Sequence, residues 1–298
     1  MKRRFFTLDV FTKTPLAGNP LAVVLESEGV SDQSMQSIAR EFNLSETVFV
    51  FPPKDKSNRA SLRIFTPATE LPFAGHPTVG TAVLFAVLDN QASSSFGLEE
   101  LVGLVACKAS RISDREGEAI FTLPRLPERI AEPAPSSMIA EALGVSVDEI
   151  GFDHHQPIIA SAGVGFNFVP LKTKDAVTRA FIKGARWTET FKAAGRPNVF
   201  VYTRETVERE HHFHARMFAP HLGIGEDPAT GAAVAGFARA FVDFEKPADG
   251  THRIVIEQGY AMGRPSQITL EMDVKGGVLV DARIGGLAVI VSEGTLRV

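Results

Sequence analysis

Three ionisable side chains stand just before apolar segments, and their types suit proton transfer. Glu46 comes two residues before the apolar run 48–51. A carboxyl group at the mouth of a buried strand is partly desolvated, which suits it to accept and return a proton. His76 and Asp227 each precede a proline and an apolar segment, and an imidazole changes charge near neutral pH. These residues indicate general acid/base chemistry. The alternative for Glu46 is an ordinary solvated turn residue.

One short pattern occurs twice, about half a chain apart. Residues 76–83 read His-Pro-Thr-Val-Gly-Thr-Ala-Val, and residues 227–234 read Asp-Pro-Ala-Thr-Gly-Ala-Ala-Val. A polar N-cap followed by proline is a favoured helix start. The pattern therefore predicts helices over 77–88 and 228–244, each capped by the first residue of its copy. Helix N-termini favour negative charge, so two of them facing each other would bind an anion. For the aspartate, a purely structural cap is an equal alternative.

Glycines accompany both copies of the pattern. Gly75 and Gly80 flank the start of the first predicted helix, and Gly231 lies near the start of the second. A helical glycine costs about 1 kcal/mol relative to alanine. Its presence at matching positions indicates either that backbone or a ligand approaches closely there, or that the helix is closely packed with no ligand. The residues alone do not decide between the two.

The size and charge of the chain limit the classes of protein it can be. A length of 298 residues predicts two domains, and the 44% hydrophobic content provides each with a core. The net charge is −4 with a pI near 6.1. Without a basic patch the sequence predicts no nucleic-acid partner.

The cysteine content and the lengths of the apolar runs indicate where in the cell the protein is expected. Cys107 is the one cysteine, so the chain can form neither an intrachain disulfide nor a pair of catalytic thiols. Asp9 interrupts the N-terminal apolar run too early for a signal peptide. No run approaches the roughly 18 apolar residues of a membrane helix. We expect a cytoplasmic protein without a membrane partner.

The predicted elements form two similar halves. Residues 32–42 predict a surface helix, because their apolar side chains recur at helical spacing. The predicted helix 77–88 is apolar on nearly all sides, which places it inside other structure. Strand-like runs surround it and its counterpart. The sequence thus predicts an α+β fold of two pseudo-symmetric domains, each a barrel-like, mostly antiparallel sheet wrapped around a central buried helix.

A proline-rich stretch separates the halves. Prolines at 124 and 127 interrupt regular structure, so we predict domains over 1–126 and 127–285. The final strand, about 286–298, is free to join either half, and a return to the first domain is one possibility.

Metal and cofactor signals are weak. His212 and His214 share one face of a predicted strand, but no third ligand has sensible spacing and Arg216 would repel a cation. The sequence has no phosphate-binding loop, no dinucleotide fingerprint and no nucleophile turn. It therefore predicts no metal and no cofactor.

Several segments together carry a family resemblance. They are Asp9-Val10-Phe11, Gly18 to Val23, Ser45-Glu46-Thr47, Glu70 to Gly80, Met217 to Pro220 and Glu226 to Gly231. In this order they resemble the PhzF-like isomerases of phenazine biosynthesis, which are related in fold to diaminopimelate epimerase. The resemblance implies two similar domains with the active site in the cleft between them. It also implies a cofactor-free, metal-free isomerase that is usually a homodimer.

The resemblance assigns roles to single residues. It implies that Glu46 is the general acid/base and that His76 and Asp227 assist proton movement or binding. The remaining residues implied to bind substrate are Asn19, Ser45, Gly75, Gly231 and Ala232. At the last of these positions the family commonly has serine, so this chain lacks a hydroxyl that could contact substrate.

The expected reaction is an isomerisation of a small carboxylic acid by proton transfer. In the phenazine pathway it is a double-bond shift in trans-2,3-dihydro-3-hydroxyanthranilate. One alternative is an epimerase of a different substrate, although a two-thiol mechanism is excluded by the single cysteine. The other is a non-catalytic binding or interaction protein on the same fold.

Overall fold

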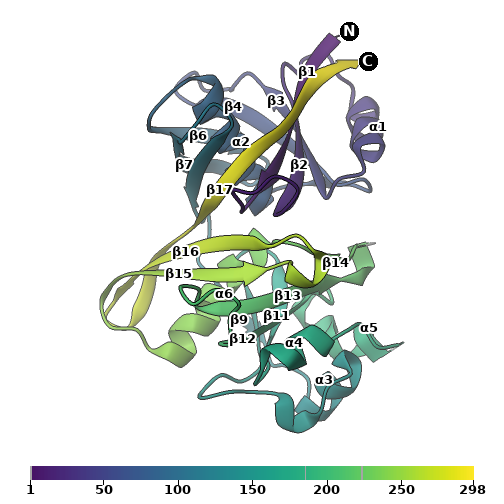
Figure 1. The fold of residues 1–298 in the computed structure, drawn as a ribbon, viewed down its shortest axis with the longest axis vertical. Coiled ribbons are helices and arrows are strands. Elements are labelled where there is room, and N and C mark those ends of the chain that lie inside the picture. Colours follow the sequence, from purple (N-terminus) through teal and green to yellow (C-terminus); the bar gives the residue numbers. More distant parts are fainter. Residues whose placement is uncertain (1, 185, 223) are drawn as a thin grey trace. The chain divides into compact units, whose positions relative to one another are not determined.

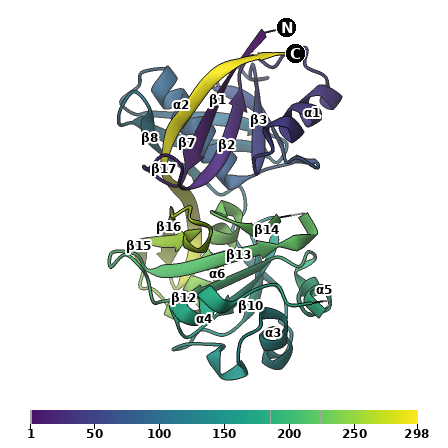
Figure 2. The same ribbon diagram turned by 45° about the vertical axis from the view of Figure 1, so that its right-hand side comes forward.

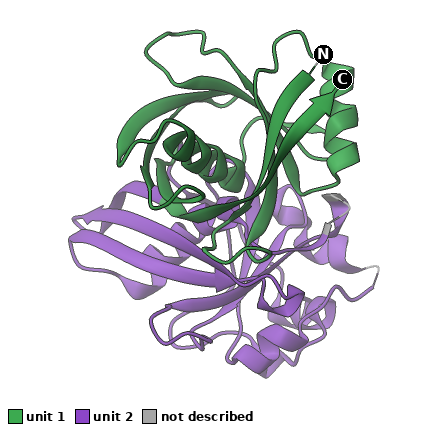
Figure 3. Ribbon diagram, turned by 45° about the horizontal axis from the view of Figure 1, so that its top comes forward, with its two compact units in different colours: residues 1–124, 284–298 green, residues 125–283 purple. Residues whose placement is uncertain are grey.

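The first strand of the chain pairs with the last. The computed structural model describes residues 2–184, 186–222 and 224–298. Strand β1 (Lys2–Val10) runs antiparallel to β17 (Val278–Arg297), from the pair Lys2 and Arg297 onward. Both chain ends therefore lie together (Figures 1 and 2). The chain divides into unit 1, residues 1–124 and 284–298, and unit 2, residues 125–283 (Figure 3).

Within the described residues of unit 1, eight strands form a closed ring. Its order is β17–β1–β2–β3–β4–β6–β7–β8 and back to β17. The pairs β2–β3 and β4–β6 are parallel, whereas β1–β2, β3–β4, β6–β7 and β7–β8 are antiparallel. The bounds are β2 (Asn19–Val24), β3 (Glu46–Phe51), β4 (Ala60–Phe65), β5 (Glu70–Leu71), β6 (Ser94–Glu100), β7 (Gly103–Arg111) and β8 (Glu116–Thr122). The short strand β5 pairs antiparallel with the end of β4, and helix α1 (Asp32–Phe42) packs against β3 and β4.

Helix α2 (Gly75–Leu88) fills the ring of unit 1 (Figure 3). All of its residues from Gly75 to Ala86 are buried, as the uniformly apolar sequence predicts. A Cβ atom on Gly80 would lie 2.6 Å from Leu21 Cδ2 and 2.7 Å from Val10 Cγ2. Gly80 therefore allows α2 to pack closely against β1 and β2. Of the two explanations that the sequence leaves open for this glycine, close packing is the one that the structure supports.

Unit 2 repeats this construction. Its strands follow the order β9–β10–β11–β12–β13–β15–β16, with β14 paired to β13, and helix α6 (Gly231–Glu245) packs against β9, β10, β11 and β16. The strands are β9 (Glu128–Ala131), β10 (Ile158–Ser161), β11 (Gly165–Pro170), β12 (Val199–Thr203), β13 (Phe213–Ala219), β14 (Ile224–Asp227), β15 (Gly250–Gln258) and β16 (Ser266–Lys275). The shorter helices are α3 (Ser136–Leu143), α4 (Lys174–Arg179) and α5 (Arg186–Phe191), with 3-10 turns at Val147–Glu149, Lys192–Ala194, Pro220–Leu222 and Tyr260–Met262.

The strand pairings recur in the same order in both units. In unit 1, β1–β2 is antiparallel, β2–β3 parallel, β3–β4 antiparallel and β4–β6 parallel. In unit 2 the pairs β10–β11, β11–β12, β12–β13 and β13–β15 repeat that alternation. Helices α2 and α6 both follow a short strand, β5 or β14, that pairs antiparallel with the strand before it. The predicted α+β fold with two pseudo-symmetric halves is confirmed.

An aromatic cluster explains why α6 is held in unit 2. The ring of Phe237 on α6 lies 4.9 Å from Tyr202 and 5.0 Å from Phe213, measured between ring centroids. Phe168 and Phe200 lie 6.2 Å and 6.1 Å from the same ring. Such aromatic pairs stabilise a core beyond the area that they bury.

The predicted helix starts are wrong in both copies of the sequence pattern. Helix α2 begins at Gly75 with Ala74 as N-cap, and α6 begins at Gly231 with Thr230 as N-cap. The ranges 77–88 and 228–244 thus become 75–88 and 231–245. His76 lies inside its helix, whereas Asp227 lies in a strand before its helix. Neither residue is a cap.

The correct register of the repeat follows from these starts. Gly75 and Gly231 are each the first helical residue, so His76 corresponds to Ala232, the second residue of α6. The sequence pattern instead aligns His76 with Asp227, five positions away from this register. A pattern built on proline and glycine tolerates such a shift because both residues also occur in the turn that leads into a helix.

No helix among the described residues is long and apolar enough to span a membrane.

Candidate active site

Glu46 and His76 meet at one end of unit 1. The Nε2 atom of His76 lies 3.3 Å from Oε2 of Glu46, and the two side chains are 6% and 14% exposed. Glu46 is the first residue of β3 and pairs with Leu21 of the parallel strand β2. His76 is the second residue of α2. The strand start and the helix start thus bring together two residues that are 30 positions apart.

The imidazole of His76 is uncharged. Burial lowers the pKa of His76 to about 3, while its hydrogen bond to the Pro20 carbonyl acts in the opposite direction. A neutral imidazole has one N–H, and the carbonyl of Pro20 takes it. Nε2 then presents its lone pair toward Glu46. The 3.3 Å contact between Nε2 and Oε2 does not have hydrogen-bond geometry, but the acid form of the Glu46 carboxyl would be able to donate to this lone pair.

Tight backbone packing places the residues beside this pair. Asn19 is fully buried at the start of β2, next to Pro20, whose carbonyl binds His76. Gly18 has φ 64°, and a Cβ there would lie 2.4 Å from the carbonyl oxygen of Val10. The site thus requires glycine at position 18. Ser45 directly precedes Glu46 and is half-buried.

Five of the eight predicted residues gather in unit 1. The parallel strands β2 and β3 both begin at the end of the barrel where α2 begins. That end carries Asn19, Ser45, Glu46, Gly75 and His76.

The other three predicted residues belong to unit 2. Asp227 ends β14 and is 8% exposed, while Gly231 and Ala232 open α6. The Thr230 hydroxyl donates a hydrogen bond to Oδ2 of Asp227, so this cap residue binds the aspartate instead of the helix. The predicted cap role of Asp227 is wrong, because Asp227 lies three residues before the N-cap Thr230, at the start of the turn 227–230.

Gln258, which no sequence motif singles out, binds the same turn. Its Nε2 donates to the Asp227 carbonyl at 2.7 Å and to the Thr230 hydroxyl at 3.1 Å. Its Oε1 accepts the Thr230 N–H at 3.1 Å. The sequence offers no clear signal, because Gln258 is one of several polar residues of β15 and its complete burial becomes visible only in the fold.

A second such residue, Glu100, supports the first turn of α2. The Thr78 hydroxyl lies 2.8 Å from both the Ala74 carbonyl and Oε1 of Glu100. The hydroxyl is the donor to both oxygens, and since it has one hydrogen it shares that hydrogen between them. Burial raises the pKa of Glu100 to about 8, against the opposing effect of its bond to Thr78. The structure thus favours a neutral Glu100.

Cys107 lies near that carboxyl group and is not an activated thiol. It is buried, and burial raises its pKa, to which Glu100 adds once that carboxyl group is ionised. A thiol acts as a nucleophile or base through its thiolate, so Cys107 is unsuited to either role.

The two histidines considered as metal ligands have other partners. Nδ1 of His212 accepts the Val255 N–H at 3.1 Å, and Nδ1 of His214 lies 2.7 Å from Oε1 of Glu257. In residues 2–184, 186–222 and 224–298, no group of three His, Cys, Asp or Glu side chains is arranged to hold a metal ion.

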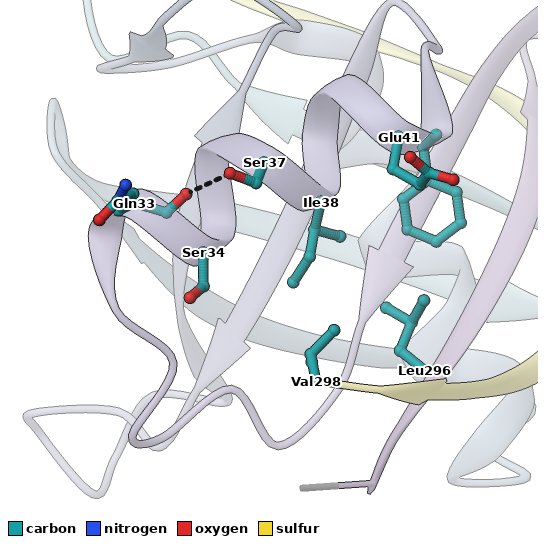
Figure 4. Close-up of a pocket in the computed structure, with 8 residues that line it drawn as sticks. Gln33, Ser34, Ser37, Ile38, Glu41, Leu296 and Val298 are labelled. Atoms are coloured by element: carbon teal, nitrogen blue, oxygen red, sulfur yellow. Dashed lines mark hydrogen bonds between the residues drawn. The ribbon is translucent and has the colours of Figure 1, made fainter.

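A pocket of about 480 Å³ lies elsewhere in unit 1, between α1 and the end of β17 (Figure 4). Its apolar side is formed by Ile38, Phe42, Leu296 and Val298. None of the residues predicted for the active site lines it.

The repeated topology, with one helix enclosed by each sheet, defines the epimerase-like class of two-domain α+β proteins. A sequence profile described as phenazine biosynthesis-like protein, the PhzC/PhzF family, matches residues 8–294. A crystal structure of a Bacillus anthracis phenazine biosynthesis protein of the PhzF family superposes with a TM-score of 0.88, at 25% identity and with 100% of both chains covered.

Two curated relatives are similar over nearly their full lengths. An uncharacterized isomerase of Mesorhizobium japonicum is 47% identical, with 99% of this chain and 98% of that protein covered. The trans-2,3-dihydro-3-hydroxyanthranilate isomerase of Pseudomonas fluorescens is 32% identical, with 98% of each chain covered. The chain belongs to the PhzC/PhzF family, and it is an isomerase. The predicted family and enzyme class are confirmed.

Proposed function

We propose that this isomerase acts without a cofactor on a small carboxylic acid, with Glu46 as general acid/base. The observation that supports this most is the contact of Glu46 with an uncharged His76. A carboxyl group beside a neutral imidazole acceptor can release a proton and recover it within one site.

The proposed reaction moves one proton and one double bond. Ionised Glu46 removes a proton from a carbon that an adjacent double bond activates, and the C–H electron pair enters the π system. The protonated Glu46 then returns the proton to another carbon of that system. Atoms and charge balance, and the product is an isomer. His76 accepts a hydrogen bond from Glu46 in its acid form and so stabilises the state in which the proton is held.

The substrate carboxylate is proposed to bind at a helix start. The N-terminal turns of α2 and α6 carry partial positive charge, which favours an anion. Gly75 and Gly231 leave the backbone of these turns uncovered by a side chain. We propose that Asp227, with Gly231 and Ala232 beside it, serves the same reaction by binding substrate or assisting proton movement.

The relatives support a double-bond shift of the type named for trans-2,3-dihydro-3-hydroxyanthranilate. Ala232 stands where the resembled family commonly has serine, and the structure places it at the position of α6 that matches His76 in α2. We therefore propose a related unsaturated carboxylic acid as the substrate class. Epimerisation at a carbon beside a carboxylate uses the same first step and is the alternative.

Solvent deuterium exchange tests this function. The wild-type protein is incubated in D₂O with a panel of small unsaturated carboxylic acids that includes the dihydro-hydroxyanthranilate, and deuterium incorporation is followed by NMR. We expect exchange and isomerisation of at least one acid. Glu46→Gln should lower that rate by about 10²- to 10⁴-fold while binding persists. Glu41→Gln, which changes an exposed carboxylate on α1, is the matched control.

The contrary outcomes are distinct. Exchange that survives in Glu46→Gln would exclude Glu46 as the base. An acid that binds to the wild-type protein without exchange or conversion would favour a binding protein on this fold. A homodimer and a cytoplasmic location stay predictions, and light scattering of the purified chain would test the first.

A further inference from the structure

We propose that Gln258 is the positioning residue for Asp227: its side-chain amide fixes the turn 227–230 and directs the one hydrogen of the Thr230 hydroxyl onto the Asp227 carboxylate. This inference rests on the proposed role of Asp227, and it adds a residue that the family resemblance does not assign.

The hydrogen-bond partners of Gln258 allow only one orientation of its side-chain amide. The Thr230 N–H can only donate, so the atom that faces it is the amide oxygen. The Asp227 carbonyl can only accept, so the atom that faces it is the amide nitrogen. Both hydrogens of that nitrogen are used, one on this carbonyl and one on the Thr230 hydroxyl. The backbone thus determines the amide orientation.

The Thr230 hydroxyl is oriented as a consequence. Its oxygen accepts from Gln258, so its single hydrogen is available for Oδ2 of Asp227. A hydrogen bond donated to a carboxylate favours the charged form. The relay from Gln258 through Thr230 therefore favours an ionised Asp227 with its carboxylate held in one direction.

The residues on either side of Gln258 hold it in place. Oε1 of Glu257 lies 2.7 Å from Nδ1 of His214 and accepts the Val207 N–H at 2.6 Å, and its Oε2 lies 2.7 Å from Nδ1 of His211. Gly259 has φ 81°, and a Cβ there would lie 2.6 Å from the Pro228 carbonyl oxygen. This turn can therefore approach the Asp227–Pro228 backbone only with glycine at position 259.

Two substitutions separate the hydrogen bonds of Gln258 from the space that its side chain fills. Gln258→Met keeps an unbranched side chain but removes all three hydrogen bonds. Gln258→Glu keeps the shape but places an acceptor where the Asp227 carbonyl and the Thr230 hydroxyl need a donor. Gln267→Met and Gln267→Glu are the matched controls, because Gln267 is the exposed residue opposite Glu257 on β16.

The readouts need no substrate. NMR titration of the ¹³C-labelled carboxyl groups gives the pKa of Asp227, and amide exchange gives the protection of the Thr230 N–H. We expect both Gln258 variants to raise the Asp227 pKa by about one unit, with the larger rise for Gln258→Glu. In Gln258→Met, Thr230 amide exchange should accelerate by at least about tenfold, which is the effect of losing a hydrogen bond worth roughly 1.4 kcal/mol. Gln258→Glu keeps an oxygen that can accept the Thr230 N–H, so its readout is the Asp227 pKa. The Gln267 variants should match the wild type.

Threonine variants provide a second route if a Gln258 variant fails to fold. Thr230→Val removes the hydroxyl at nearly constant shape and should raise the Asp227 pKa, whereas Thr230→Ser should restore it. An unchanged Asp227 titration and Thr230 exchange in folded Gln258 variants would overturn the proposal. If the titration shifts but no acid of the panel ever exchanges deuterium with the wild type, Gln258 still positions Asp227 and the proposed function is the part that fails.

Discussion

His76 Nε2 lies 3.3 Å from Glu46 Oε2, and the other ring nitrogen of His76 is committed to the carbonyl of Pro20. This relationship joins a helix start to two strand starts through a single imidazole. Because the ring is buried and neutral, it supports the carboxyl group as an acceptor and not as a counter-ion. Acid conditions should therefore weaken the arrangement.

The first prediction concerns the stability of unit 1 at low pH. Burial lowers the pKa of His76 from 6.5 to about 3, so between these values the native protein binds fewer protons than the unfolded chain. Stability present at neutral pH is then lost as the pH falls from 6.5 toward 3.

His76→Gln should make the free energy of unfolding less dependent on pH in this window. Urea unfolding at pH 7 and pH 4 measures this, with exposed His154→Gln as control. An equal pH dependence in His76→Gln and wild type would contradict it.

Glu100 should give the free energy of unfolding the opposite dependence on pH, in a higher range. Burial raises its pKa from 4.5 to about 8, so in this range the native protein binds more protons than the unfolded chain. The contribution to stability is complete below pH 4.5 and is lost as the pH rises through 8.

Glu100→Gln should remove that decline, because an amide does not ionise in this range and its oxygen can still accept from the Thr78 hydroxyl. Thermal unfolding midpoints between pH 5 and pH 9 test it, and Glu41→Gln should behave like the wild type. A Glu100→Gln variant that still loses stability over this range would show that another group causes the decline.

Gly80→Ala should destabilise unit 1 although alanine favours helices. The added methyl group would meet Leu21 and Val10 at less than 3 Å, and overpacking of this kind costs about 1–3 kcal/mol. The gain in helix propensity is about 1 kcal/mol, so we expect a net loss of roughly 1 kcal/mol in the free energy of unfolding. Gly225→Ala, where a Cβ meets nothing within 4 Å, is the control. A Gly80→Ala protein that is more stable than the wild type would contradict this prediction, and it would show that the Leu21 and Val10 side chains move aside at little cost.

Ala232→Ser tests how the second residue of α6 affects substrate choice. A hydroxyl at this position would add one hydrogen bond to a bound carboxylic acid. A hydrogen bond contributes about 0.5–1.5 kcal/mol, so kcat/KM for trans-2,3-dihydro-3-hydroxyanthranilate should rise up to about tenfold. Ala233→Ser, at the buried neighbouring position, is the comparison for effects on folding. Unchanged substrate specificity in a folded Ala232→Ser protein would show that other residues determine the choice of substrate.

Much of this protein follows from the sequence by itself. The helix at 32–42 is predicted to the residue, because its apolar spacing and its Ser31-Asp32 start are local signals. The enclosed helices are predicted because a segment apolar on all sides has no stable place in water. The family segments identify the isomerase class, since their order and spacing extend over nearly the whole chain.

The tertiary structure alone decided where those helices begin and what surrounds their first turns. Thr230 caps α6 without bonding the helix, because its hydroxyl is used by Asp227 and Gln258. Gln258 is 28 residues from Thr230, so no local pattern connects them. Glu100, 22 residues from Thr78, is neutral because the fold buries it beside one hydroxyl. Burial and hydrogen-bond partners come from packing between distant strands, and these determine which polar residues serve the site.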